Sequence, residues 1–156
     1  MDHNMDHKMP LPALILGFGG LIPFIWGTAC LYNPELNALS VEMFGPRMSS
    51  PFIQLSYGTI IICFISGILW GFSATVEDAT LRTYGLILSS IPAIWVFFMV
   101  GGGPVQSAIN LIVGFIAVLA LDFYYNYLGL NPKWWIRLRV ILTVFVVIFL
   151  GIIAFA

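Results

Sequence analysis

Apolar residues fall into five long runs that are separated by shorter polar gaps. The runs cover residues 10–32, 52–72, 84–100, 105–128 and 134–156. A hydrocarbon layer of about 30 Å needs roughly 20 helical residues to cross it, and lipid offers no hydrogen-bond partner to backbone outside a helix or a closed barrel. The pattern therefore predicts an all-α integral membrane bundle of five transmembrane helices. Residues 1–9 are expected to form a short polar tail, and residues 10–156 a single domain.

Prolines and glycines mark the ends and the irregular points of these runs. Pro23 and Pro92 lie inside the first and third runs, and each is predicted to kink its helix because proline lacks a backbone N–H. Residues 101–104 read Gly-Gly-Gly-Pro, which predicts a tight turn between antiparallel third and fourth helices. In the long gap 33–51, Asn-Pro and Gly-Pro turn signals enclose residues 35–44, which are expected to form a short helix on the outer surface.

Charge supports this architecture and gives the bundle an orientation. Of the 156 residues, 60% are hydrophobic and 8% are charged, against about 25% charged in soluble domains. The net charge of −1 gives no indication of nucleic acid binding. Five of the six lysines and arginines fall on one predicted side, and they are Lys8, Arg82, Lys133, Arg137 and Arg139, with Arg47 on the other. The positive-inside rule then predicts an inside N-terminus and an outside C-terminus.

Asp122 lies within an apolar run rather than between runs. An intramembrane carboxylate is by default a candidate functional group, so a proton relay, a cation site or a counter-ion is one interpretation. The preferred interpretation is structural. The last two runs form a hairpin centred between Leu130 and Asn131, and Asp122 and Arg139 lie at equal distances from that centre. Antiparallel packing is therefore expected to pair them, close to the inner boundary of the membrane.

Two rows of residues on the predicted helices suggest packing or a polar path. The fourth run carries a polar stripe that winds slowly around its helix, made of Gln106, Ser107, Asn110, Gly114 and Asn126. Interhelical hydrogen bonding is preferred for this stripe over a hydrophilic path through the bundle. The second run carries small residues at a spacing of four, Thr59, Cys63, Gly67 and Gly71. Small residues let helices approach closely, so this row is expected to pack against the first helix, with an oligomer interface as the alternative.

The sequence carries no pattern that points to a catalytic site or a cofactor. Cys30 and Cys63 are not spaced as metal ligands, and no histidine lies inside a run to ligate haem. His3, behind a free amine, is a candidate Cu(II) ligand, although a solvated tail is the preferred interpretation. We therefore predict no catalytic residue, no cofactor and no metal.

Several short motifs resemble one known family. They are Gly-Leu-Ile-Pro-Phe at 20–24, Tyr-Gly at 57–58 with Ser-Gly-Ile-Leu-Trp-Gly at 66–71, and Trp-Trp-Ile-Arg-Leu-Arg at 134–139 with Leu-Thr at 142–143. Together they resemble the transmembrane protein 69 family of small five-span membrane proteins, over nearly the whole chain. At the position of Trp135, members of this family more usually have tyrosine. The resemblance implies a membrane location, favours a bacterial or mitochondrial inner membrane, and supplies no catalytic residues.

Three functional hypotheses follow. The first is a non-catalytic accessory or assembly subunit that contacts lipid and packs against a larger inner-membrane complex. The second is a small transporter or proton pathway that uses Asp122, Arg139 and the polar stripe. The third is a lipid or quinone enzyme with an inner-face site formed around Asp122, Asn126, Arg137 and Arg139, together with Trp70 and Trp134.

Overall fold

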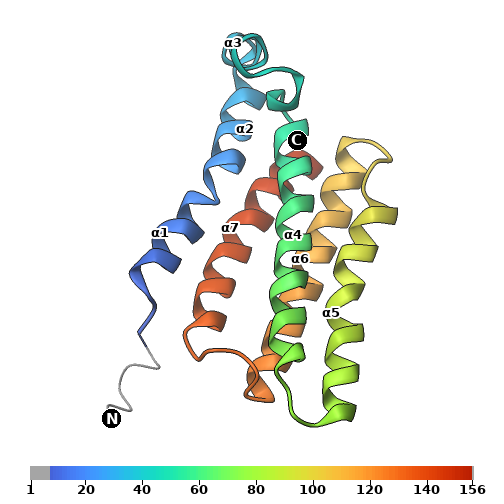
Figure 1. Cartoon of the computed structure of the whole chain (residues 1–156). Coiled ribbons are helices and arrows are strands. Elements are labelled where there is room, and N and C mark those ends of the chain that lie inside the picture. The colour runs from blue at the N-terminus through green and yellow to red at the C-terminus, as the bar shows by residue number, and fades with distance from the viewer. Residues whose placement is uncertain (1–7, 156) are drawn as a thin grey trace.

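Five long helical spans run side by side in residues 8–155, which are the residues that this computed structural model describes (Figure 1). The first span consists of two helices, α1 (Leu11–Gly19) and α2 (Ile22–Tyr32). The other four are α4 (Phe52–Ala74), α5 (Ala79–Met99), α6 (Pro104–Tyr127) and α7 (Trp135–Phe155). All five spans are long and apolar enough to cross a membrane. The predicted all-α bundle of five spans is confirmed.

The first span is broken between α1 and α2 rather than kinked at its proline. Pro23 occupies the first turn of α2, where its missing N–H is not needed. A continuous helix would require that N–H to bond to the carbonyl of Gly19. The chain instead closes α1 with bonds from the Gly20 N–H to the carbonyls of Leu16 and Gly17, at 3.0 and 3.2 Å. Pro92, by contrast, lies inside α5, which continues through it to Met99.

A short helix and a turn lie above α2 and α4 at the upper end of the bundle in Figure 1. Helix α3 (Pro34–Phe44) begins where the Asn33 side chain accepts a hydrogen bond from the Leu36 N–H at 3.0 Å, and it is followed by the 3₁₀ turn η1 (Pro46–Met48). The Ser40 hydroxyl accepts from the Trp26 indole at 3.0 Å and donates to the Met48 carbonyl at 3.1 Å. This one hydroxyl ties α3 to both α2 and η1. The helix expected over residues 35–44 is confirmed.

The connection between α5 and α6 depends on backbone conformations that favour glycine. Gly101 and Gly103 have φ values of 142° and 123°, which L side chains rarely adopt. The Ser107 hydroxyl accepts from the Gly101 N–H at 3.1 Å, and the Asn110 side chain donates to the Met99 carbonyl. The turn predicted from the Gly-Gly-Gly-Pro sequence therefore joins two antiparallel helices in contact.

The core lies among α4, α5, α6 and α7. The most extensive contacts join α4 to α5 and α6 to α7. The side chains of Ile62, Leu69, Leu111 and Leu150 are fully buried between these helices. The first span lies at the edge of the bundle, and α1 diverges from it toward the N-terminus (Figure 1). A gap in the packing is therefore expected where α1 leaves its neighbours.

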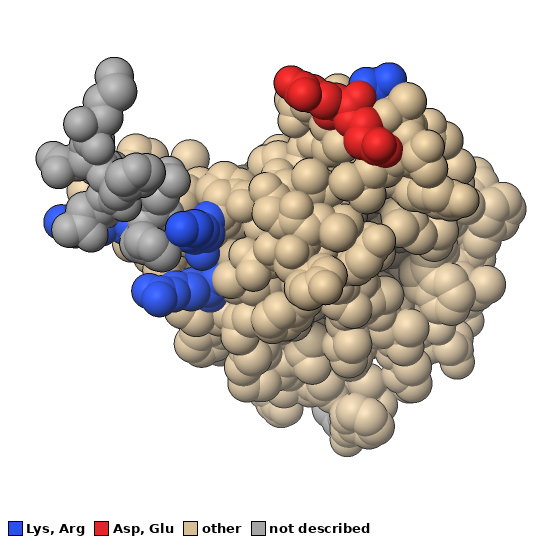
Figure 2. Space-filling view, turned by 90° about the horizontal axis from the view of Figure 1, so that it is seen from below, with Lys and Arg blue, Asp and Glu red and all other residues tan. Residues whose placement is uncertain are grey.

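The start of α1 and the end of α7 lie at opposite ends of the bundle (Figure 1). Seen from below the view of Figure 1, basic side chains gather at one edge, and the acidic side chains lie at another edge with a further basic side chain beside them (Figure 2). The α4–α5 connection at this end carries Glu77 and Asp78, and Lys133 precedes α7. Arg139, counted with the inner cations above, instead lies inside α7 and is buried. Without Arg139, four lysines and arginines lie on the predicted inner side and one on the outer side. The inside N-terminus stays a prediction.

Candidate functional site

A buried ion pair joins the last two helices. The Arg139 Nε donates to Asp122 Oδ2 at 2.7 Å, and the Trp135 indole N–H donates to Asp122 Oδ1 at 2.6 Å. Asp122 is 0% exposed and Arg139 is 4% exposed. Both carboxylate oxygens are therefore engaged by α7, out of contact with water. Charged hydrogen bonds are stronger than neutral ones, and these two join α6 directly to α7.

The turn after α6 sets the register of this pair. Gly129 has a φ of 71°, and the Leu130 N–H returns to the Tyr125 carbonyl at 2.9 Å, a reversal typical of helix ends at glycine. The Asn131 side chain then donates to the backbone carbonyl of Asp122 at 3.1 Å. Asp122 is therefore fixed through its backbone as well as through its carboxylate.

Two polar groups on the same face of α7 remain without partners. Among the described residues, the buried Arg139 Nη2 and the buried Thr143 Oγ1 have no hydrogen-bond partner. Thr143 is 3% exposed and follows Arg139 by one helical turn. Unpaired polar groups in apolar surroundings are costly. This face of α7 therefore has an unused donor and an unused hydroxyl that a ligand could engage.

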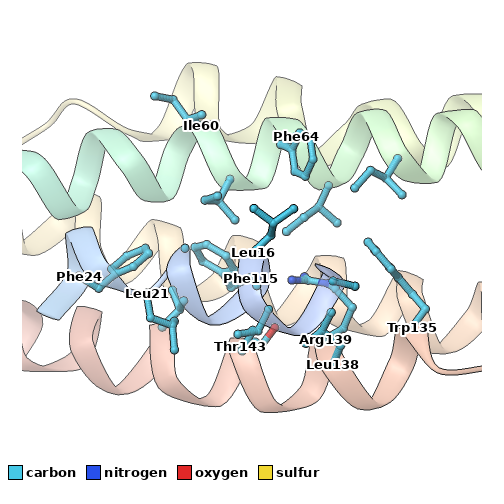
Figure 3. A pocket seen from close by; sticks show the side chains of 18 of the residues that line it. Leu16, Leu21, Phe24, Ile60, Phe64, Phe115, Trp135, Leu138, Arg139 and Thr143 are labelled. Atoms are coloured by element: carbon cyan, nitrogen blue, oxygen red, sulfur yellow. The ribbon is translucent and has the colours of Figure 1, made fainter. Parts of the chain in front are cut away.

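That face borders an apolar groove of about 560 Å³. The groove runs between the first span, α4 and α7, where α1 diverges from the bundle. Of the four residues within 8–155 that have buried unpartnered side-chain atoms, Arg139 and Thr143 line it. Figure 3 shows both side chains extending from α7 toward the space between the helices, near Leu16 and Phe115. The rest of the lining is mainly aliphatic and aromatic.

Other residues of the predicted inner-face cluster lie away from the ion pair. Arg137 and Asn126 are exposed, on the outer faces of α7 and α6. Trp70 is 50% exposed. Trp134, however, lines the groove together with Trp135. The structure therefore places Asp122, Arg139 and the two tryptophans near one another, and leaves Arg137 and Asn126 at the surface.

The polar stripe of α6 does not form one continuous set of contacts. Gln106 donates to the Asn110 side chain at 3.0 Å, and Ser107 accepts from the α5–α6 turn. These three residues therefore complete a turn at the end of the bundle opposite Asp122. The buried residues Leu111, Phe115 and Val118 lie between them and Asp122, and Gly114 faces the Ile62 side chain.

The small-residue row of α4 lies on an open face of the bundle. Cys63, Gly67 and Gly71 are exposed, and Thr59 is half-buried. Nothing described lies within 4 Å of a Cβ built on Gly67 or Gly71. The first span, expected to cover this row, approaches α4 elsewhere. A Cβ on Gly27 would lie 2.5 Å from the Gln54 side chain, and Gln54 also donates to the Thr28 hydroxyl at 3.1 Å.

Trp135 and Thr143 were not singled out as polar contacts by the sequence. Trp135 follows a second tryptophan at the membrane boundary, a position typical of an interfacial belt, yet its N–H faces inward to Asp122. Trp135 follows Asp122 by thirteen residues and lies near the centre of the same hairpin. This spacing is the sequence feature that could have indicated the contact. The sequence did not indicate an unpartnered hydroxyl at Thr143. A threonine in a helix commonly donates to the carbonyl four residues before it. His3 lies outside the described residues.

Comparison with known proteins identifies the family. A family model described as "Protein of unknown function (DUF3429)" matches residues 9–155. The chain belongs to the DUF3429 family. It is 31% identical over 144 residues to "Transmembrane protein 69" of Xenopus tropicalis, covering 86% of this chain and 50% of the relative.

A second relative of this DUF3429 protein gives the same result. "Transmembrane protein 69" of Mus musculus is 28% identical over 137 residues, covering 86% of this chain and 51% of the relative. The chain thus spans about half the length of the curated relatives it matches. No solved structure matches it. The predicted resemblance to the transmembrane protein 69 family is confirmed, and the chain is an integral membrane protein that contacts lipid.

Proposed function

We propose that the chain is a non-catalytic accessory or assembly subunit that packs against another integral membrane protein through the outer face of α4. The observation that carries this proposal is the open row of Cys63, Gly67 and Gly71. These residues follow one another at one-turn intervals on the helix that contacts α2, α5, α6 and α7.

The chemistry of this face suits a second helix. Small residues expose the helix backbone, and close backbone approach lets helices associate in lipid, where no hydrophobic drive brings them together. Trp70, at 50% exposure, flanks the row. A partner helix seated on the glycines would bury it. The family resemblance supports an energy-transducing setting for such a partner, in a bacterial or mitochondrial inner membrane.

The natural cysteine on this face allows a direct test. Cys63 is exposed and Cys30 is buried, so an apolar reagent with a maleimide at one end and a photoreactive benzophenone at the other, added to native membranes and irradiated, is expected to link Cys63 to a second membrane protein. The Cys63→Ser variant is expected to lose the adduct and the Cys30→Ser variant to keep it. Adduct formation should be abolished by Gly71→Leu combined with Gly67→Leu.

A matched control separates loss of the partner from loss of the fold. Gly151 of α7 also has no described neighbour within 4 Å of a built Cβ, so Gly151→Leu should leave the adduct intact. If the double glycine variant folds, as judged by its unfolding midpoint, and still forms the adduct, the proposal is wrong. Recovery of the protein as a lone monomer from native membranes would also contradict it.

The transport hypothesis is supported less well by the geometry. Both oxygens of Asp122 are bound within the protein, and the polar residues at the start of α6 serve the α5–α6 turn. It predicts that Asp122→Asn abolishes a flux across vesicles that contain the protein. The enzyme hypothesis required Arg137 and Asn126 at an inner-face site, and both are exposed away from the groove.

A further inference from the structure

The groove beside α7 is open to lipid along its rim and closed by the bundle at its floor. At its rim Leu16 is 75% exposed and Phe64 is 64% exposed. At its floor Phe115 is 1% exposed and Ile65 is 3% exposed. An apolar molecule dissolved in the bilayer can therefore enter sideways, between the first span and α4, without crossing an aqueous surface.

The unpartnered groups lie deeper than the membrane boundary. Helix α7 begins at Trp135, and the rise of about 1.5 Å per residue places Arg139 about 6 Å and Thr143 about 12 Å along it. Since the hydrocarbon layer is about 30 Å thick, Thr143 lies close to the middle of the membrane. A ligand that satisfies both groups must carry its hydrogen-bonding atoms into the hydrocarbon layer.

The charge at the site favours a neutral ligand. The guanidinium of Arg139 has five N–H donors and no acceptor, and only Nε is used, by the carboxylate of Asp122. The positive charge is therefore already balanced. An anionic head group would place an uncompensated negative charge in the apolar layer, which is costly, whereas a neutral carbonyl oxygen can accept the unused N–H groups.

We propose that the groove binds a membrane quinone, with its ring between Arg139 and Thr143 and its isoprenoid tail along the apolar channel. The quinone carbonyls accept hydrogen bonds from the Arg139 Nη2 and the Thr143 hydroxyl. Phe115 and the rim residue Phe64 supply aromatic surface for the ring. A glycerolipid fits less well, because its ester and phosphate oxygens stay near the membrane boundary while Thr143 lies near the middle.

Tryptophan fluorescence provides the test. The full chain is placed in nanodiscs of phosphatidylcholine and titrated with a para-benzoquinone that carries a decyl tail. Quinones quench tryptophan emission, and Trp134 and Trp135 line the groove. We expect a saturable component of quenching above the linear background from quinone dissolved in the lipid. We expect Thr143→Val to weaken this binding about tenfold, because one buried hydrogen bond to the quinone is lost.

The substitution and its control are chosen so that folding does not obscure the result. The Thr143 hydroxyl has no partner among the described residues, so valine removes no contact within them. Thr83→Val, on exposed α5 surface away from the groove, should bind like the wild type. Quenching without a saturable component would overturn the proposal, and so would equal affinity of wild type and Thr143→Val. Displacement of the quinone by phosphatidylglycerol would overturn it in favour of an anionic lipid.

Discussion

Removing one partner of the Asp122–Arg139 pair should destabilise the bundle at least as much as removing both. In Asp122→Asn the charge of Arg139, which is 4% exposed, loses its counter-charge. In Arg139→Met the carboxylate of Asp122, which is 0% exposed, loses its cation. Breaking a buried pair in this way costs about 3–5 kcal/mol. Arg139 lies only about 6 Å from the start of α7, so it can move toward water, and we expect the lower end of this range.

The double variant Asp122→Asn with Arg139→Met leaves no unpaired charge. It should cost no more than either single variant, which gives a coupling energy of at least about 3 kcal/mol between the two positions. The free energy of unfolding is measured for all four proteins in mixed detergent micelles by titration with sodium dodecyl sulfate, followed by tryptophan fluorescence. Arg137→Met, at an exposed arginine on the same helix, is the control and should change it by less than about 0.5 kcal/mol.

Additive costs would refute this reasoning. If the double variant loses the sum of the two single losses to within about 0.5 kcal/mol, the groups do not interact energetically. The 2.7 Å contact would then contribute nothing to the stability of the hairpin. A single loss below about 1 kcal/mol would show that water or other groups compensate the charge.

Two further substitutions test the packing of the bundle. Tyr125→Phe removes a buried hydroxyl that donates to the Gly85 carbonyl at 2.8 Å and lies 2.7 Å from the Ser73 hydroxyl, so we expect a loss of about 1–3 kcal/mol by the same unfolding titration. Gly27→Ala places a methyl group 2.5 Å from the Gln54 side chain and should cost about 1–3 kcal/mol. An unfolding midpoint unchanged by either substitution would contradict the corresponding contact.

Some of the fold follows directly from local sequence. The apolar runs predicted five spans, and the structure has them in residues 8–155 with ends that differ by a few residues. Helix α5 begins at Ala79, five residues before the predicted start at 84, because the Asp78 side chain accepts from the Leu81 N–H at 2.7 Å. A hydropathy pattern detects the apolar part of a helix and misses a polar first turn that is stabilised by its cap.

The candidate site was predictable only in part. Equal distances from a hairpin centre were enough to suggest Asp122 opposite Arg139, because two antiparallel helices joined by a short turn keep a fixed register. The role of Trp135 was not predictable in the same way. Whether an indole at the boundary faces lipid or a neighbouring carboxylate depends on the rotation of α7 about its axis, which the packing of the whole bundle sets.

The sequence by itself determined that this chain lies in a membrane, how many times it crosses, and roughly where its spans begin and end. These properties depend on residues close together in the chain and on the cost of exposing backbone or charge to lipid. Only the tertiary structure decided which faces of the helices are covered. In that structure the small-residue row of α4 is uncovered and α1 is separated from the bundle. Arg139 and Thr143 line the resulting groove. In lipid an apolar face is equally compatible with lipid and with protein, so hydropathy alone does not distinguish a packed face from an open one.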